Sequence, residues 1–308
     1  MRSLTLGPAA TLSVADIREA ADRIRPHLRR TPLLDLHIGD RRILMKLEYL
    51  QRSGSFKLRG ALNAMLCGPL DDHVVAASGG NHGLAVATAA ALLNVPATIY
   101  VPHTVPSAKA RRIVAAGARL VRHGATFAEA AAAAADAAAR PGHRFLHPYD
   151  DPAVIAGQGT VAAEIVADAP GVDTIAVAVG GGGLAAGTAL TVEQRAVVAA
   201  EPEHCCCLHD ALAAGGPTTS AVNSVAASAT GASRVGELPF AILAGHNVSS
   251  VLVSDEQILQ ARDRLWEECR IAAEPAAAIP FAAWVAGRVP GELPCLIVCG
   301  ANTDWTPE

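Results

Sequence analysis

The chain has 308 residues, of which 51% are hydrophobic and 18% charged, and its formal net charge at pH 7 is −4. This length and composition predict a sizeable buried core in one large domain or two modest ones. The mild charge and the absence of a Lys/Arg block argue against nucleic-acid binding. The sequence contains no uninterrupted apolar stretch of about 18 residues, so a membrane span is not expected.

Short β-branched runs alternate along the chain with alanine-rich helical stretches. The runs are nearly continuous in apolar residues, which is typical of parallel sheets buried on both faces in α/β proteins. The expected strands are 42–47, 74–77, 98–101, 119–122, 174–179, 196–200, 250–253 and 295–299. The expected helices include 83–93, 107–116 and 126–139, and capping boxes predict two further helix starts at Ser13 and Ser254.

The first candidate for chemistry is Lys57, in the turn Ser53-Gly54-Ser55-Phe56-Lys57-Leu58-Arg59-Gly60. A lysine in a Gly/Ser turn is most often a solvated side chain. At the start of a helix and flanked by small residues, however, it can be held where a carbonyl group reaches it. Burial also lowers the pKa of a lysine toward the neutral, nucleophilic amine.

A second loop, Ser78-Gly79-Gly80-Asn81-His82-Gly83, lies between an expected strand and an expected helix. Backbone N–H groups at a helix N-terminus bind anions, so this loop suits a substrate carboxylate.

Four consecutive glycines, Gly180, Gly181, Gly182 and Gly183, also follow an expected strand and precede a small-residue stretch. Without Cβ atoms the backbone can approach an anion closely, which suits a phosphate. A tight turn is one alternative. A Rossmann dinucleotide site is another, with Glu201 as its acidic residue, although that site wants a spaced G-x-G-x-x-G.

At these residues the sequence resembles the fold type II enzymes that use pyridoxal 5′-phosphate (PLP), specifically the serine/threonine dehydratase and serine racemase family. The stretches 55–60 and 156–160, with the motif forms SFKxRG and AGQGT, are highly specific in combination. The resemblance covers nearly the whole chain and includes 30–33, 46–51, 78–83, 180–183, 274–276 and 299–302.

The resemblance implies a role for each motif residue. Lys57 would form the Schiff base with PLP and later remove the α-proton, Phe56 would flank the cofactor ring, and Asn81 would bond its 3′-oxygen. The glycines 180–183 would hold the phosphate. Cys299 would face the pyridine nitrogen, and a neutral thiol there favours β-elimination because it leaves that nitrogen unprotonated.

The substrate carboxylate would be held by the loop Ser78, Gly79, Gly80, Asn81 and His82. The implied architecture has two α/β lobes, similar to the β subunit of tryptophan synthase, each with a largely parallel sheet flanked by helices. The larger, cofactor-binding domain would comprise 1–70 and 148–308, and a smaller mobile domain, 71–147, would close over a small amino acid. Tyr149, at the expected crossing between the lobes, is a further candidate pocket residue. The resemblance also implies a homodimer.

We therefore expect a PLP-dependent ammonia-lyase acting on L-threonine, L-serine or a related β-hydroxy amino acid. A racemase is disfavoured, because racemases of this family need a serine where this chain has Gly79. A nicotinamide oxidoreductase would explain the glycines but not Lys57 or Cys299. A non-catalytic PLP-binding paralogue stays open, because Asn223 and Cys207 depart from the family pattern.

The cysteines bear on metal binding and on location. Glu201 matches the acid of the family's cation site, but Cys205 and Cys207 replace its later ligands, and hard cations prefer oxygen. A soft-metal site with His204 and His209 is an alternative, although adjacent cysteines have poor geometry for one ion. We therefore expect no metal. With adjacent cysteines and no recognisable signal peptide, we expect a soluble, cytoplasmic protein.

Overall fold

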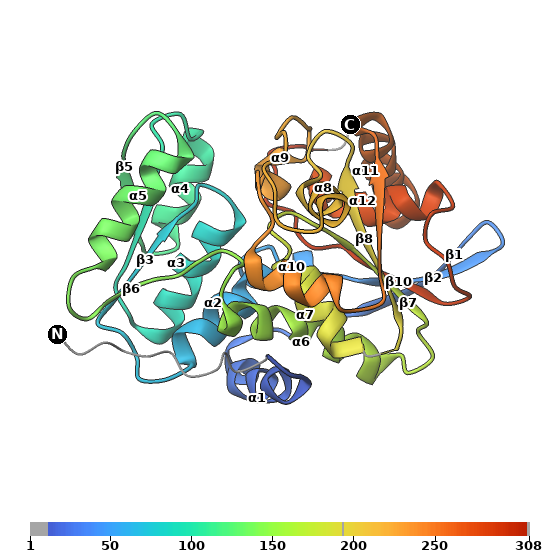
Figure 1. Cartoon of the computed structure of the whole chain (residues 1–308), viewed down its shortest axis with the longest axis horizontal. Coiled ribbons are helices and arrows are strands. Elements are labelled where there is room, and N and C mark those ends of the chain that lie inside the picture. Colours follow the sequence, from blue (N-terminus) through green and yellow to red (C-terminus); the bar gives the residue numbers. More distant parts are fainter. Residues whose placement is uncertain (1–11, 193, 307–308) are drawn as a thin grey trace.

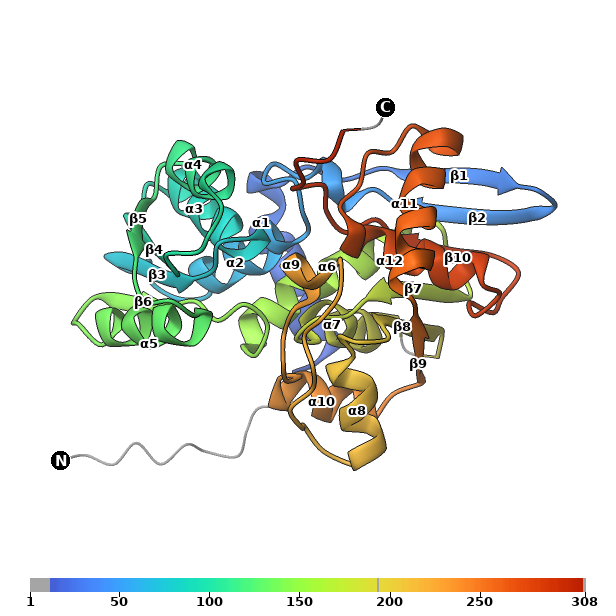
Figure 2. The ribbon, with the colours of Figure 1, turned by 90° about the horizontal axis from the view of Figure 1, so that it is seen from above.

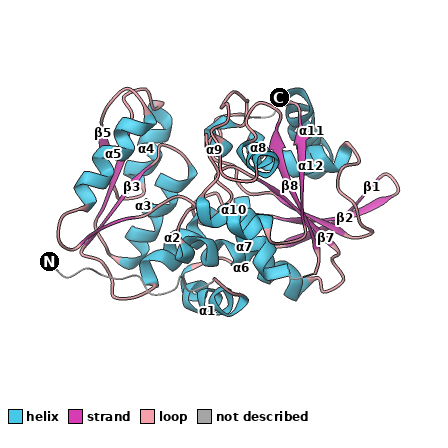
Figure 3. Ribbon diagram, viewed as in Figure 1, coloured by secondary structure: helices cyan, strands magenta, loops and turns pink. Residues whose placement is uncertain are grey.

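The computed structural model describes residues 12–192 and 194–306. Figure 1 shows two bodies side by side, one built around β3 to β6 and the other around the remaining strands, and Figure 3 shows helices on both. No helix among the described residues is both long enough and apolar enough to cross a bilayer.

The larger sheet has six strands in the order β1-β2-β10-β7-β8-β9. β1 pairs antiparallel with β2, and this hairpin projects from the edge of the molecule (Figure 2), whereas the other pairs in the sheet are parallel. The strands are β1 (Leu33–Ile38), β2 (Arg41–Lys46), β7 (Thr174–Ala178), β8 (Ala196–Pro202), β9 (Val248–Val253) and β10 (Pro294–Ile297).

The smaller sheet has four parallel strands in the order β5-β4-β3-β6. They are β3 (His73–Ala77), β4 (Ala97–Val101), β5 (Arg119–Arg122) and β6 (His143–Phe145). Every strand of this sheet falls between residues 73 and 145.

The helices connect successive strands and cover the sheets. They are α1 (Val14–Ile24), α2 (Lys57–Leu66), α3 (Asn81–Leu93), α4 (Ser107–Ala115), α5 (Phe127–Ala138), α6 (Pro152–Asp168), α7 (Gly183–Val192), α8 (Cys207–Ala214), α9 (Ala227–Thr230), α10 (Glu237–Ala244), α11 (Asp255–Cys269) and α12 (Pro275–Val285), with short 3-10 turns at Arg25–His27 and Glu48–Leu50. The predicted capping boxes at Ser13 and Ser254 are both formed.

Each sheet has its own hydrophobic cluster. Buried side chains of β7, β8 and β10 pack with α6, α7 and α12 in the larger cluster. In the second cluster, Leu58 and Leu62 of α2 join Val74 and Ile99 of the smaller sheet. The helix α2 therefore contributes to the smaller sheet's core, although it precedes residue 71 in the sequence.

The predicted fold class, largely parallel sheets flanked by helices, is confirmed. Each strand expected from the sequence has a counterpart, with ends that differ by a few residues. Two strands were not predicted. β1 is the antiparallel edge of its sheet and alternates between exposed and partly buried residues, and β6 has only three residues, so neither forms a continuous apolar run.

Candidate active site

Lys57 is the first residue of α2, as the sequence predicted. Its Nζ donates a hydrogen bond to the carbonyl oxygen of Pro148 at 2.8 Å and lies 5.2 Å from the centroid of the Phe56 ring. Burial lowers the pKa of the Lys57 ammonium to about 8, against the opposing effect of the Cys299 thiol. A lysine in this environment can supply a neutral amine near physiological pH.

A buried ion cluster anchors the first turn of α2. Arg59 is fully buried and donates to both carboxylate oxygens of Glu48, at 2.8 and 2.7 Å, and to both of Glu164, at 2.9 Å each. A fifth bond, at 3.1 Å, goes to the Thr160 hydroxyl, so every guanidinium N–H has an acceptor. These bonds hold the helix start that carries Lys57.

The four glycines connect β7 to α7 and line one cavity together with Phe56, Lys57, Asn81 and Cys299. We call this cavity the inner cavity. Within the part of the chain that the structure describes, the N–H groups of residues 181–185 donate to no protein acceptor. Unpaired N–H groups at a helix N-terminus are the donors that a phosphate takes up, so the residues present fit the phosphate of PLP.

Close packing makes these glycines necessary. A Cβ atom on Gly181 would collide with the ring of Tyr149, and one on Gly180 would lie 3.0 Å from the Cα of Thr230. Gly182 has a φ of +92°, a backbone conformation that residues with a side chain rarely adopt. The loop is therefore closely surrounded by protein, and Tyr149, the candidate pocket residue at the lobe crossing, forms part of its wall.

The second loop lines a different cavity. The residues Ser78 to His82 line a cleft of about 540 Å³, called the outer cleft here, that also includes Lys57 and Tyr149. The N–H of Gly80 donates to the Ser78 hydroxyl oxygen at 3.2 Å. Among the described residues, the N–H groups of Asn81 and His82 have no acceptor, so they are free to bind a carboxylate.

His82 has a partner away from the cleft. Its Nε2 lies 2.9 Å from the carbonyl oxygen of Leu146 and donates to it in the neutral tautomer. Burial lowers the pKa of His82 to about 3, and the charge of Lys57 acts in the same direction. The imidazole is therefore neutral at physiological pH and fixes α3 to the end of β6.

Cys299 follows β10 and is 5% exposed. Burial raises the pKa of its thiol, so the group is neutral. Since the inner cavity also contains Lys57 and the glycines, a neutral thiol is available where the resemblance expects one.

Gly79 cannot gain a side chain without a rearrangement. A Cβ atom there would collide with Cγ2 of Val105. The local packing therefore leaves no room for a serine side chain at this position.

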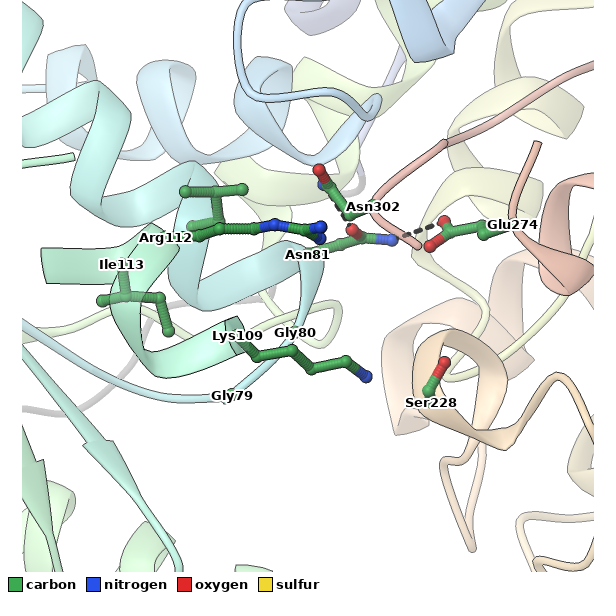
Figure 4. A pocket seen from close by; sticks show the side chains of 10 residues that line it. Gly79, Gly80, Asn81, Lys109, Arg112, Ile113, Ser228, Glu274 and Asn302 are labelled. Atoms are coloured by element: carbon green, nitrogen blue, oxygen red, sulfur yellow. Dashed lines mark hydrogen bonds between the residues drawn. The ribbon is translucent and has the colours of Figure 1, made fainter. Parts of the chain in front are cut away.

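Four residues of the site were not assigned a role from the sequence: Lys109, Ser228, Glu274 and Asn302. Figure 4 shows Lys109 of α4 extending across the gap toward Ser228, and Glu274 close to Asn81. Glu274 and Asn302 lie in motifs of the resemblance, which was the available signal. Lys109 and Ser228 lie in no such motif, and only the tertiary structure brings them to the cleft.

Glu201 is enclosed by backbone donors. Its carboxylate oxygens accept from the N–H groups of Leu208 and His209, at 2.9 and 2.8 Å, and burial raises its pKa to about 7. The Cys207 thiol donates to the carbonyl oxygen of Gly180 at 3.1 Å. In the described part of the chain, no three His, Cys, Asp or Glu side chains form a group that could hold a metal ion.

The chain is 33% identical over 321 aligned residues to the L-threonine dehydratase catabolic TdcB of Staphylococcus aureus (strain USA300), and the alignment covers 99% of this chain and 93% of the relative. It superposes on the threonine deaminase of T.th. with a TM-score of 0.91 and 35% identity, covering 96% of this chain and all of the other. The serine racemase of Dictyostelium discoideum gives a TM-score of 0.88 and 31% identity, with 96% and 100% coverage.

Residues 24–300 match the family described as pyridoxal-phosphate dependent enzymes, and this match spans most of the chain. The resemblance inferred from the sequence is thus confirmed, and with it the cofactor that the family uses. This chain belongs to the pyridoxal-phosphate dependent enzyme family.

Proposed function

We propose that the protein is a PLP-dependent ammonia-lyase that eliminates the β-hydroxyl group of L-threonine, L-serine or a related amino acid. The observation that carries this proposal is the position of Lys57, which lines the inner cavity with one loop and the outer cleft with the other. Among the described residues, both loops have free backbone N–H groups. One loop can bind the cofactor's phosphate and the other the substrate's carboxylate. The products would be ammonia and a 2-oxo acid.

The proposed cofactor site uses side chains of different chemistry. Bound PLP would supply an electron sink for the charge left when the α-proton departs. Asn81 would donate a hydrogen bond to the 3′-oxygen of the cofactor, and Cys299 would face the pyridine nitrogen as a neutral thiol. The residues that would hold the cofactor are Phe56, Lys57, Asn81, Gly180, Gly181, Gly182, Gly183 and Cys299.

Lys57 is the proposed base. Its lowered pKa supports this role, because the neutral amine can accept the α-proton. The Ser78 hydroxyl would donate to the substrate carboxylate while its oxygen accepts from the N–H of Gly80. Gly79, Gly80, Asn81 and His82 would complete the carboxylate site.

The smaller domain, 71–147, is proposed to close over the substrate, which would exclude water from the reacting atoms. The outer cleft supports this, because its lining comes from both proposed domains, with Ser78 from the smaller and Ser228 from the larger.

We also propose a homodimer in the cytoplasm. All seven cysteines are free, which suits a reducing compartment.

A racemase is the second candidate, because one of the similar structures is a serine racemase. The packing of Val105 against Gly79 argues against it, since the racemases of the family need a serine hydroxyl at that position. Asn223 and Cys207 left a non-catalytic paralogue open. Neither residue lines the outer cleft, and Cys207 donates to the Gly180 carbonyl of the tetraglycine loop. This favours a catalytic site over a silent one.

The test is to purify the protein with PLP, record its visible spectrum, and measure 2-oxo acid release from L-serine and L-threonine. Lys57→Ala should lose both the visible band and the oxo acid. Lys109→Ala is the matched control, because it removes a lysine from the same cleft and should keep the band. A band without oxo acid would favour the racemase or the paralogue, and no band in the parent would exclude PLP binding by this site.

A further inference from the structure

A chain of side-chain amides and one carboxylate crosses the site behind Asn81. The Nδ2 of Asn302 donates to the backbone oxygen of Ser53 at 2.9 Å and to Oδ1 of Asn81 at 2.7 Å. The Nδ2 of Asn81 then donates to Oε1 of Glu274 at 2.6 Å (Figure 4). The chain joins four segments of the sequence: the turn before α2, the start of α3, the start of α12 and the segment after β10.

These contacts fix the direction of the Asn81 amide. The carboxylate of Glu274 accepts hydrogen bonds, so it selects the NH₂ end of Asn81, and the NH₂ group of Asn302 selects the oxygen end. If the amide were turned over, two oxygens would face each other at one end and two NH₂ groups at the other. The Nδ2 of Asn81 carries a second hydrogen, which stays available to the inner cavity that Asn81 shares with Lys57.

The backbone leaves space for both partners. A Cβ atom on Gly300 would collide with Oε1 of Glu274, and one on Gly54 would lie 2.6 Å from Oδ1 of Asn302. Gly54 also has a φ of +74°. Two glycines from separate motifs are thus required where the chain of hydrogen bonds passes, which is unexpected if the contacts were incidental.

Glu274 is also a buried acid. It is 3% exposed, and burial raises the pKa of its carboxyl group to about 7, while the hydrogen bond from Asn81 and the charge of Lys109 oppose the rise. The titratable and charged groups that share a cavity with Glu274 are Lys109 and Arg112 of α4, Lys57 of α2, Tyr149, and Cys299, which follows β10.

We propose that Glu274 and Asn302 are positioning residues, which orient the Asn81 amide so that its free N–H meets the 3′-oxygen of the cofactor. In addition, Glu274 places a carboxylate beside the cofactor ring. This inference rests on the proposed function, since it takes Asn81 as a ligand of PLP.

The two residues should differ in a measurable way. Glu274→Gln removes the charge, and a glutamine can donate as well as accept, so it no longer selects the NH₂ end of Asn81. We expect about tenfold weaker PLP binding. We also expect the pH midpoint of the bound cofactor's visible band to fall by about one unit, because a nearby carboxylate stabilises the protonated form.

Asn302→Ala removes only a neutral donor. PLP binding should weaken by several-fold while the pH midpoint stays that of the parent, because no charge changes. Glu201→Gln is the matched control: this acid is also buried and also has a pKa raised to about 7, but it bonds to α8 and lines neither cavity. It should change neither quantity.

The experiment therefore measures PLP affinity and a pH titration of the visible band for the parent holoenzyme and the three variants, with circular dichroism to verify folding. A lowered midpoint in Glu274→Gln alone, with weaker PLP binding in Glu274→Gln and Asn302→Ala, supports the proposal. If Glu274→Gln is folded and behaves like Glu201→Gln, the proposal is overturned. If it does not fold, Asn302→Ala decides, and parent-like affinity there overturns the proposal. A parent without a visible band would overturn the proposed function itself.

Discussion

The two anion-binding loops of this protein share one design, a strand followed by glycines and a helix start, yet their surroundings differ. The tetraglycine loop is enclosed by the ring of Tyr149 and by the backbone at Thr230. The Ser78 loop faces a wide cleft, and a Cβ atom on Gly79 would meet a side chain, that of Val105, and not backbone. We expect the enclosed loop to bind a resident cofactor and the open loop to admit and release substrate.

The first loop has no side chain, whereas the second carries the hydroxyl of Ser78, while the ring of His82 is bonded to the Leu146 carbonyl away from the cleft. A rigid set of N–H groups suits an anion that stays bound, because no reorganisation is needed. A loop with side-chain donors can improve its contacts as the substrate enters. Substitutions in the two loops should therefore affect different quantities.

The largest effect is expected from Gly181→Ala. Its Cβ atom would collide with the Tyr149 ring, and overpacking of this kind costs about 1–3 kcal/mol of folding stability. Relief of the clash displaces the loop and with it the N–H groups that would hold the phosphate, so PLP should bind up to about a hundredfold more weakly. Equilibrium titration with PLP measures this. In a Tyr149→Ala background the same substitution should cost much less, and an equal cost in both backgrounds would show that the ring is not the cause.

Ser78→Ala should affect the substrate instead. Loss of a hydrogen bond to a charged group costs about 1.5–3 kcal/mol, so KM for L-threonine should rise about tenfold or more. PLP affinity should stay that of the parent, because Ser78 does not line the inner cavity. Steady-state kinetics and the PLP titration together check this, and a fall in PLP affinity would break the division of roles between the loops.

Gly79→Ser should have a moderate effect on stability. The new side chain must displace Val105, at a cost of about 1 kcal/mol or more, which lowers Tm by a few degrees in a protein of this size. Adding Val105→Ala should recover part of the loss. Differential scanning calorimetry of both variants tests this, and an unchanged Tm in the single variant would mean that Val105 yields freely.

The smallest effect at neutral pH concerns His82. Its folded pKa of about 3 lies below the unfolded value of about 6.5, so only the unfolded state gains a proton between these values, and stability falls as the pH falls through that window. Relative to pH 7.5, His82 should cost about 1.4 kcal/mol at pH 5.5.

Denaturant unfolding of the parent and of His82→Gln at the two pH values measures the difference. Glutamine can still donate to the Leu146 carbonyl, so only the pH dependence should change. Equal losses in both proteins would mean that His82 does not contribute to acid sensitivity.

The sequence by itself determined the features that depend on neighbouring residues. Alternation of apolar runs and alanine-rich stretches predicted the α/β fold, because periodicity and helix propensity are local properties. Lys57 was correctly expected at the start of a helix, and both glycine loops were correctly expected between a strand and a helix. Strands β1 and β6 were missed, because edge position and short length remove the continuous apolar pattern.

Only the tertiary structure decided which distant residues meet. Asn81 and Glu274 are 193 positions apart, and Asn81 and Asn302 are 221 apart, yet each pair forms a direct hydrogen bond. The approach of Lys109 to Ser228 likewise depends on how the two sheets with their helices are placed, and that of Val105 to Gly79 depends on the pairing of β3 with β4. A local pattern encodes the hydrogen bonds of one helix or strand, whereas the orientation of an amide in the site depends on side chains that packing brings from other elements.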